Sequence, residues 1–127
     1  MVEQLMVLKE KEFNIVKNYT IKIKEQTLFK ANGEEGLHLW ESSVVLARWC
    51  FYNNKIFDNK KIIELGSGCG LLGLSIAKHS NAKEIVLTDH MDIVMHNLNE
   101  NLVNNSQNHV HYKQEFDYNE FTNNTIE

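Results

Sequence analysis

Alternating apolar and polar residues mark the N-terminal part of the chain. Residues 19–26, written YTIKIKEQ, place isoleucine and lysine at alternate positions. A period of two is typical of a strand with one buried and one solvated face. The preceding residues 12–16, EFNIV, are apolar enough to pair with this strand. We therefore expect residues 1–30 to form a short N-terminal β extension.

The pattern changes to alternating helices and strands further along the chain. Residues 40–54 carry apolar side chains at helical spacing, and Ser42 and Ser43 near the start can cap free backbone amides. Three apolar runs then predict strands over residues 61–65, 83–89 and 109–117. The stretches between them predict helices over residues 70–80 and 91–105. Such an alternation indicates βαβ units and a parallel sheet.

Three glycines follow the first strand of this alternation. Residues 62–76 read IIELGSGCGLLGLSI, with Gly66, Gly68 and Gly70 at every second position. Glycine tolerates the positive φ of a tight turn and lets a ligand approach the backbone. In an open parallel sheet, ligands bind beyond the carboxyl ends of the strands, where the next helix presents unpaired amides. This turn is therefore the main candidate for a cofactor site.

Two cofactor classes compete for the glycine turn. Gly68, Gly70 and Gly73 match the G-x-G-x-x-G of dinucleotide folds, but Gly66 and Ser67 then intervene after the strand. Counted from the strand end, the pattern is acidic-Leu-Gly-x-Gly-x-Gly, which resembles the S-adenosylmethionine (SAM) binders of the class I methyltransferase type. A glycine-rich connection without a ligand is the third alternative, because a single short motif has false positives.

Asp89 is a second candidate residue for the same site. It ends the run EIVLTD, about twenty residues after the first glycine, where an acidic residue can accept hydrogen bonds from both ribose hydroxyls. The alternative for Asp89 and Asp92 is to cap the following helix. Because only Asp89 closes the strand, we assign ribose binding to Asp89 and capping to Asp92.

Composition and charge narrow the class of protein. The 127 residues suffice for one small domain or for part of a larger one, and 43% hydrophobic residues suffice for a core. A formal net charge of −4 offers no broad basic field, so nucleic acid is disfavoured as a primary ligand. The six histidines form no metal-ligand spacing, and we expect no metal site.

Cysteine usage and the N-terminus bear on the compartment. The two cysteines, Cys50 and Cys69, lack the paired spacing of disulfide or zinc frameworks, so we interpret Cys50 as core and Cys69 as a small turn residue. Charged residues interrupt the first thirteen positions, unlike the apolar core of a signal peptide, and no stretch is long enough to span a bilayer. We expect a cytoplasmic protein, with the nucleus as the alternative.

Four segments together resemble the seven-β-strand lysine methyltransferases of methyltransferase family 16. They are GLHLWESSVVLARW, IIELGSGCGLLGLSIAKH, EIVLTD and NLNEN, within a resemblance over residues 19–118. The resemblance implies an α/β fold, a Rossmann-like class I methyltransferase sheet with helices on both faces. It also implies SAM as cofactor and a lysine of a partner protein, such as a chaperone or translation factor, as methyl acceptor.

The same resemblance implies how much of the fold the chain holds. Residues 31–127 are expected to be the N-terminal, SAM-binding half of the methyltransferase domain. The later strands of the sheet and an Asp-x-x-Tyr segment that shapes the acceptor pocket would then lie outside this sequence. The chain would be truncated, completed by another chain, or a degenerate protein that binds without catalysis. The resemblance therefore assigns no catalytic residue.

Positions that match the family pattern imply cofactor contacts. Trp40 matches a tryptophan lining the cofactor pocket, and Glu64 matches the acid that faces the methionine amino group, often through water. The full set of implied cofactor-binding residues is Trp40, Glu64, Gly66, Ser67, Gly68, Gly70, Asp89 and Tyr118. Tyr118 would stack against the adenine.

Each of these roles has a structural alternative. Trp40 would otherwise be a core aromatic of the helix, Glu64 a buried cap and Tyr118 a surface aromatic. Asn97 and Asn101 match paired asparagines of the family that tie helix to loop, whereas Trp49 is interpreted as core. For the whole chain, the alternatives are a methyltransferase of a small molecule or nucleic acid, and a non-catalytic protein-binding module.

Overall fold

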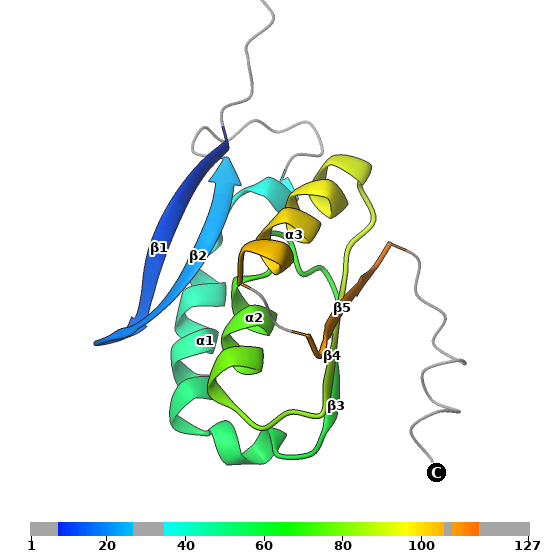
Figure 1. Cartoon of the computed structure of the whole chain (residues 1–127). Helices are drawn as coiled ribbons and strands as arrows, with labels where there is room; N and C mark the ends of the chain where they lie inside the picture. Colours follow the sequence, from blue (N-terminus) through cyan, green and yellow to red (C-terminus); the bar gives the residue numbers. More distant parts are fainter. Residues whose placement is uncertain (1–7, 27–34, 106–107, 115–127) are drawn as a thin grey trace, which may run out of the picture.

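A computed structural model describes residues 8–26, 35–105 and 108–114 of the chain. Its elements, in chain order, are β1 (Leu8–Val16), β2 (Tyr19–Gln26), the 3-10 turn η1 (Glu35–Leu37), α1 (Glu41–Tyr52), η2 (Asn54–Phe57), β3 (Lys61–Glu64), α2 (Leu71–His79), β4 (Glu84–Thr88), α3 (Asp92–Asn105) and β5 (Val110–Lys113). The predicted order of strands and helices is confirmed. Figure 1 shows three layers, with the helices between a hairpin and a sheet.

The sheet beneath the helices consists of three parallel strands in the order β3-β4-β5. Ile62, Ile85 and Val110 lie in register across the three strands and belong to or pack on the core. Both crossovers run in one direction along the sheet, so right-handed connections place α2 and α3 on the same face. In Figure 1, α1 lies on that face as well.

The predicted Rossmann-like α/β sheet is thus present, with helices on one face in the described part of the chain. The opposite face carries Ile63 and Val86, which are half-buried. Covering of that second face by helices stays a prediction. None of the described helices is long and apolar enough to cross a membrane.

The N-terminal strands form an antiparallel hairpin of their own. β1 pairs with β2 around a tight turn in which Asn18 has a φ of 70°. Ile15, Ile21 and Ile23 are at most 1% exposed, and the hairpin packs them toward the helices. The alternation of isoleucine and lysine therefore has the cause that the pattern predicts, since one strand face is buried and the other meets solvent.

Helix α1 corrects two predictions. Ala47 and Cys50 are buried, but Trp49 is 52% exposed, so its assignment to the core is wrong. Each residue turns an α-helix by about 100°, and the face that meets the rest of the molecule passes through Ala47 and Cys50 while Trp49 points away from it. The predicted serine capping is also wrong, because no side chain caps this helix and the residue before it is Trp40.

Candidate functional site

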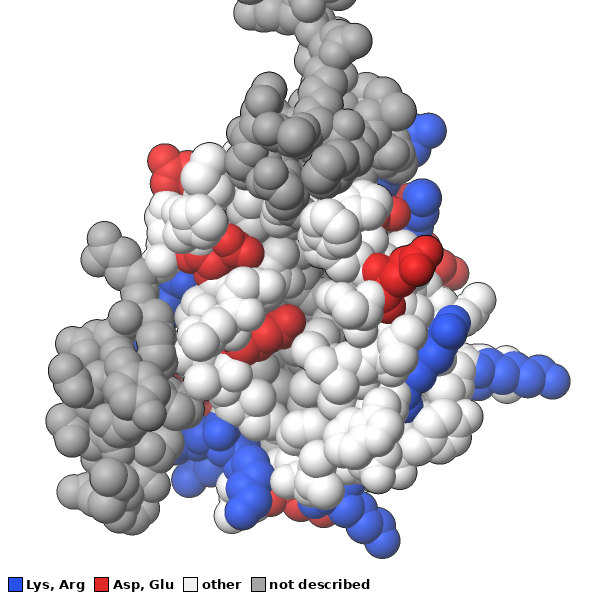
Figure 2. Space-filling model, turned by 180° about the vertical axis from the view of Figure 1, so that it is seen from behind, with Lys and Arg blue, Asp and Glu red and all other residues white. Residues whose placement is uncertain are grey.

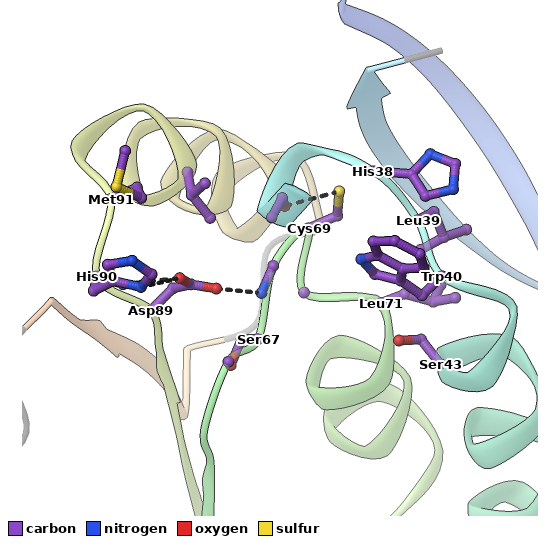
Figure 3. Close-up of a pocket in the computed structure, with 15 residues that line it drawn as sticks. His38, Leu39, Trp40, Ser43, Ser67, Cys69, Leu71, Asp89, His90 and Met91 are labelled. Atoms are coloured by element: carbon purple, nitrogen blue, oxygen red, sulfur yellow. Dashed lines mark hydrogen bonds and ion pairs between the residues drawn. The ribbon is translucent and has the colours of Figure 1, made fainter. Parts of the chain in front are cut away.

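A cavity of about 250 Å³ lies at the carboxyl ends of β3 and β4 (Figure 3). Three segments far apart in the sequence form its wall: the stretch from η1 into α1, the glycine loop between β3 and α2, and the residues after β4. The cavity-lining residues are Gly36, His38, Leu39, Trp40, Ser43, Gly66, Ser67, Gly68, Cys69, Gly70, Leu71, Asp89, His90, Met91 and Val94. Ligand sites of open parallel sheets occur at this edge.

The cavity brings together six of the eight predicted site residues. Trp40, Ser67, Asp89 and the three glycines of the loop all line it. Glu64 lies outside the lining, and Tyr118 lies outside the described residues. The common location follows from the parallel sheet, because consecutive strands present their carboxyl ends at the same edge.

The glycine loop needs glycine for two separate reasons. Gly66, Gly68 and Gly70 have φ values of 66°, 55° and 90°, in the region that disfavours side chains. A Cβ on Gly70 would also lie 2.6 Å from Leu98 Cδ1, so packing requires its absence. A Cβ on Gly66 would meet nothing within 4 Å, which leaves open space above this part of the loop.

Ser67 ties the glycine loop to the sheet. Its amide donates to the Thr88 carbonyl at 2.7 Å, which prolongs the pairing of β3 and β4 beyond the end of β3. Its hydroxyl donates to the Glu64 carbonyl at 3.1 Å and accepts from the Thr88 amide at 3.0 Å. Ser67 is 8% exposed, and its hydroxyl serves the loop itself. The motif predicted Ser67 as a cofactor-binding residue, but it did not predict that the Ser67 hydroxyl bonds the backbone of Glu64 and Thr88.

Asp89 lies between the end of β4 and the glycine loop. Its Oδ2 accepts a hydrogen bond from the Gly68 amide at 2.9 Å, and its Oδ1 accepts one from the His90 amide at 2.8 Å. His90 Nδ1 lies 3.3 Å from the same Oδ1. An ionised carboxylate has about four acceptor sites, so Asp89 retains acceptor capacity toward the cavity.

Asp92 does not have the helix-capping role that the sequence predicts for it. Helix α3 begins at Asp92, and the Met95 amide bonds to the carbonyl of Met91. Met91 therefore holds the N-cap position, and the prediction that Asp92 caps the helix is wrong. The carboxylate of Asp92 instead accepts a hydrogen bond from Gln114.

Glu64 ends β3 and turns its carboxyl under α2. Its Oε2 is buried without a hydrogen-bond partner among the described residues, and a Cβ on Gly73 would lie 2.8 Å from it. Burial raises the pKa of Glu64 to about 7, the backbone amide of Gly73 opposes this rise, and the negative charge of Asp89 adds to it. A substantial fraction of this carboxyl is therefore protonated at neutral pH.

Trp40 stands at the opposite wall of the cavity. It is the residue before α1, with extended φ and ψ of −81° and 139°, and its ring meets the His38 ring edge-on at 5.0 Å. Because Trp40 is 46% exposed, the alternative that it is a core aromatic is wrong. An exposed aromatic at a cavity wall is suited to contact a planar or sulfur-bearing ligand.

Sequence reasoning missed the contribution of η1. A Cβ on Gly36 would lie 2.7 Å from Val94 Cγ2, so glycine lets η1 approach α3 closely. The Gly36 carbonyl accepts a long hydrogen bond, 3.6 Å, from Cys69 Sγ in the glycine loop. The available sequence signal was a glycine in a turn just before the aromatic stretch.

An open parallel sheet with a glycine loop after one strand and a carboxylate after the next defines a Rossmann-like cofactor fold. The chain belongs to the lysine methyltransferase family, whose profile matches residues 15–125. The predicted class I methyltransferase resemblance is therefore confirmed. Within the described residues, no group of three or more histidine, cysteine or acidic side chains could hold a metal ion.

The chain matches only part of the length of each individual relative. The human protein-lysine N-methyltransferase EEF2KMT is 33% identical over 86 residues, which are 68% of this chain and 26% of that protein. Ribosomal RNA small subunit methyltransferase G of Prochlorococcus marinus is 40% identical over 92 residues, 68% of this chain and 38% of that protein. The chain thus spans about a quarter of the length of the human relative.

Solved structures show the same fold. PH0793 from Pyrococcus horikoshii superposes with a TM-score of 0.65 at 17% identity, covering 91% of this chain and 38% of PH0793. M. jannaschii TYW2, solved in complex with AdoMet, superposes with a TM-score of 0.53 at 20% identity, covering 81% of this chain and 42% of TYW2.

Proposed function

We propose that this chain forms the SAM-binding part of a protein-lysine N-methyltransferase. The observation that carries the proposal is the convergence of the glycine loop and Asp89 on one cavity, in a chain of the lysine methyltransferase family. SAM carries a ribose with two hydroxyls, a methionine group with an ammonium and a carboxylate, and an adenine ring. A site for it needs acceptors, a close backbone and an apolar wall.

The residues present fit these three requirements, and Leu39, Trp40 and Leu71 supply the apolar wall. Asp89 offers carboxylate acceptors for the ribose hydroxyls, and the space above Gly66 lets a ligand approach the backbone. The first-turn amides of α2 suit a carboxylate, because the positive end of the helix dipole lies there. The buried carboxyl of Glu64, whose Oε2 lacks a hydrogen-bond partner in the described structure, offers an acceptor beneath the loop, and a nearby ammonium would favour its ionised form.

The chain's own part in the reaction is binding, orientation and exclusion of water. When bound, SAM supplies an electrophilic methyl group on its sulfonium. Trp40 and Asp89 would hold opposite sides of the cofactor, so that it keeps one orientation in the cavity. Fixed orientation and desolvation contribute much of the rate in such transfers.

The proposed acceptor is a lysine of a protein, with a translation factor or chaperone as candidate partner. The human relative named a protein-lysine N-methyltransferase supports this class of substrate. The ribosomal RNA methyltransferase relative favours RNA as the alternative acceptor. A net charge of −4 weighs against RNA, and Figure 2 shows acidic residues interspersed with basic ones on one face of the described chain.

Calorimetric titration of SAM and of NADH into the full chain tests the cofactor. We expect SAM to bind and NADH to give no heat of binding. Binding of NADH without SAM would overturn the methyltransferase proposal. Binding of neither would favour a non-catalytic protein-binding module.

Asp89 variants test the site. Asp89→Ala should weaken SAM binding about 100-fold, because two hydrogen bonds to a charged acceptor are lost, and Asp89→Asn should weaken it less because one oxygen remains. Asp92→Asn removes the same charge three residues away, outside the cavity lining, and should leave the affinity within about twofold. Unchanged affinity in Asp89→Ala would remove Asp89 from the site.

Transfer from methyl-labelled SAM into a cell extract tests the acceptor. We expect label that protease removes and ribonuclease does not. Ribonuclease-sensitive label would favour the RNA alternative. SAM binding without any transfer would restrict the chain's function to holding the cofactor.

A further inference from the structure

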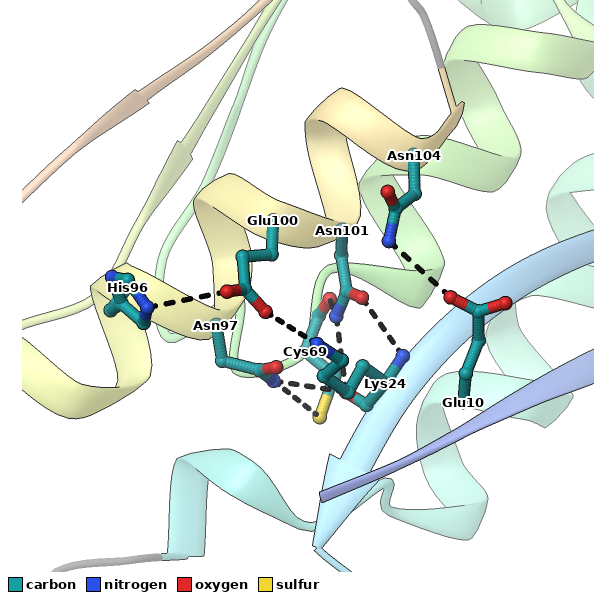
Figure 4. Close-up of polar contacts among 8 residues, drawn as sticks. All are labelled: Glu10, Lys24, Cys69, His96, Asn97, Glu100, Asn101 and Asn104. Carbon is teal, nitrogen blue, oxygen red and sulfur yellow. Dashed lines mark hydrogen bonds and ion pairs between the residues drawn. The ribbon is translucent and has the colours of Figure 1, made fainter.

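Two buried asparagines connect the N-terminal hairpin to the glycine loop. Asn97 and Asn101 are both 0% exposed and lie one turn apart on α3. Figure 4 shows them pointing between Lys24 of β2 and Cys69 of the loop. A buried amide side chain is costly unless it is hydrogen-bonded, so the contacts of these two residues indicate what they do.

Asn101 bridges two segments that are distant in the sequence. Its Nδ2 donates to the Cys69 carbonyl at 2.9 Å and to the Lys24 carbonyl at 3.1 Å, while its Oδ1 accepts from the Lys24 amide at 2.8 Å. One side chain thus binds both backbone groups of a β2 residue and one carbonyl of the glycine loop.

Asn97 supports the same junction. Its Nδ2 donates to the Lys24 carbonyl at 2.9 Å and lies 3.9 Å from Cys69 Sγ. Cys69 is therefore held through its carbonyl by Asn101 and contacted at its sulfur by Asn97. It sits between Gly68 and Gly70, both with positive φ, in a stretch that loses much conformational entropy when it is ordered.

We propose that Asn101 is a positioning residue that uses the hairpin to hold the glycine loop, so that the β1–β2 hairpin is a structural part of the cofactor site. The expected effect on SAM affinity rests on the proposed SAM-binding function. The positioning of the loop rests on the hydrogen bonds alone. Through Asn101, packing of the hairpin restrains the Cys69 carbonyl and lowers the entropy that the loop must lose on binding.

Asn105 provides a matched control one turn further along α3. Its Nδ2 donates to the Lys22 carbonyl at 2.8 Å and its Oδ1 accepts from the Lys22 amide at 3.3 Å. These bonds repeat the Asn101 contact with β2, and Asn105 Nδ2 also donates to the Asn101 carbonyl at 2.8 Å, within the helix. Asn105→Ala therefore removes a second anchor of β2 but leaves the bonds of Asn101 to Lys24 and Cys69 in place.

Hydrogen exchange of the Gly68 and Gly70 amides tests the positioning without any ligand. In Asn101→Ala, we expect both amides to exchange about tenfold faster relative to the Ala77 amide, which lies inside α2 and reports opening of the core. Asn105→Ala should leave that ratio within about twofold. Equal ratios in the two variants would overturn the proposal.

SAM affinity tests the consequence, under conditions where every variant is folded. We expect Asn101→Ala to weaken SAM binding about tenfold and Asn105→Ala to leave it within about twofold. If Asn101→Ala does not fold, Asn101→Ser, which keeps one hydroxyl donor, takes its place in both measurements. If the wild type binds no SAM, the proposed function fails, while the exchange ratios still decide whether Asn101 positions the loop.

Discussion

At the scale of single residues, Glu64 shows how the fold changes the chemistry of a side chain. It ends β3, and α2 covers its carboxyl where Gly73 leaves room. Burial raises the pKa of Glu64 to about 7, with the charge of Asp89 as a further cause. The sequence motif identifies an acid at this position, but its ionisation follows from the helix above it.

Glu64→Gln should make stability less dependent on pH. Wild-type Glu64 keeps its proton in the folded state up to about pH 7, whereas 4.5 is its ordinary pKa. Because the folded state binds more protons in this window, the stability present below pH 4.5 is lost as pH rises through 7, on the order of 3 kcal/mol. Glutamine removes this loss.

Urea unfolding at several pH values measures the effect. We expect Glu64→Gln to be more stable than wild type at pH 8, with the difference shrinking toward pH 5. Glu41→Gln, at an exposed position in α1, controls for the loss of one negative charge. A wild-type stability that does not fall between pH 5 and 7.5 would contradict the buried, protonated carboxyl.

At the scale of elements, the glycine loop joins β3 to α2 with two different demands. All three loop glycines have positive φ, but Gly70 is also packed against Leu98, whereas Gly66 faces open space in the cavity. The motif predicts the turn and its register. Which glycine serves packing and which faces the ligand depends on α3, which follows in the sequence and could not be placed from the motif.

Gly70→Ala and Gly66→Ala should therefore differ. Both pay about 1–2 kcal/mol for a left-handed residue, and Gly70→Ala adds about 1–3 kcal/mol because Leu98 must move. We expect Gly66→Ala to weaken SAM binding more than Gly70→Ala does, although it costs less stability, since its methyl group enters the cavity. Urea unfolding and SAM titration of both variants measure this, and the reverse order of stabilities would contradict the packing role of Gly70.

At the scale of the whole molecule, the described chain exposes an apolar strip on α1. Val45, Trp49 and Tyr52 are 66%, 52% and 75% exposed and are spaced by four and three residues, which places them on one helix face. Contiguous exposed apolar surface of this kind marks an interaction site or promotes self-association. Net charge and composition alone do not predict it.

The isolated chain should accordingly associate as its concentration rises. Replacing Trp49 by Glu together with Tyr52 by Lys should reduce association, because charges are costly to bury in an apolar contact. Sedimentation velocity over a concentration series measures this. Val103→Lys, at another exposed apolar position on α3, is the control and should change little; an equal reduction in that variant would exclude a specific role for α1.

Periodicity and turn chemistry predicted most of the fold and several of the residues that line the candidate cavity. The hairpin, the alternation of strands and helices, the glycine turn and Asp89 all depend on neighbours within a few residues, so they could be read locally. Trp49 was placed wrongly, because its environment depends on which face of α1 meets the rest of the molecule. The exposed position of Trp40 likewise depends on contacts between distant segments.

The sequence by itself determined the order of elements, the parallel sheet, and the family to which the chain belongs, because spacing of apolar residues and glycines encodes them directly. Only the tertiary structure decided which residues meet. It brought Gly36 to the glycine loop, buried the carboxyl of Glu64 under α2, and joined β2 to Cys69 through Asn101. These are contacts between residues far apart in the chain, and local patterns carry no information on the distance between them.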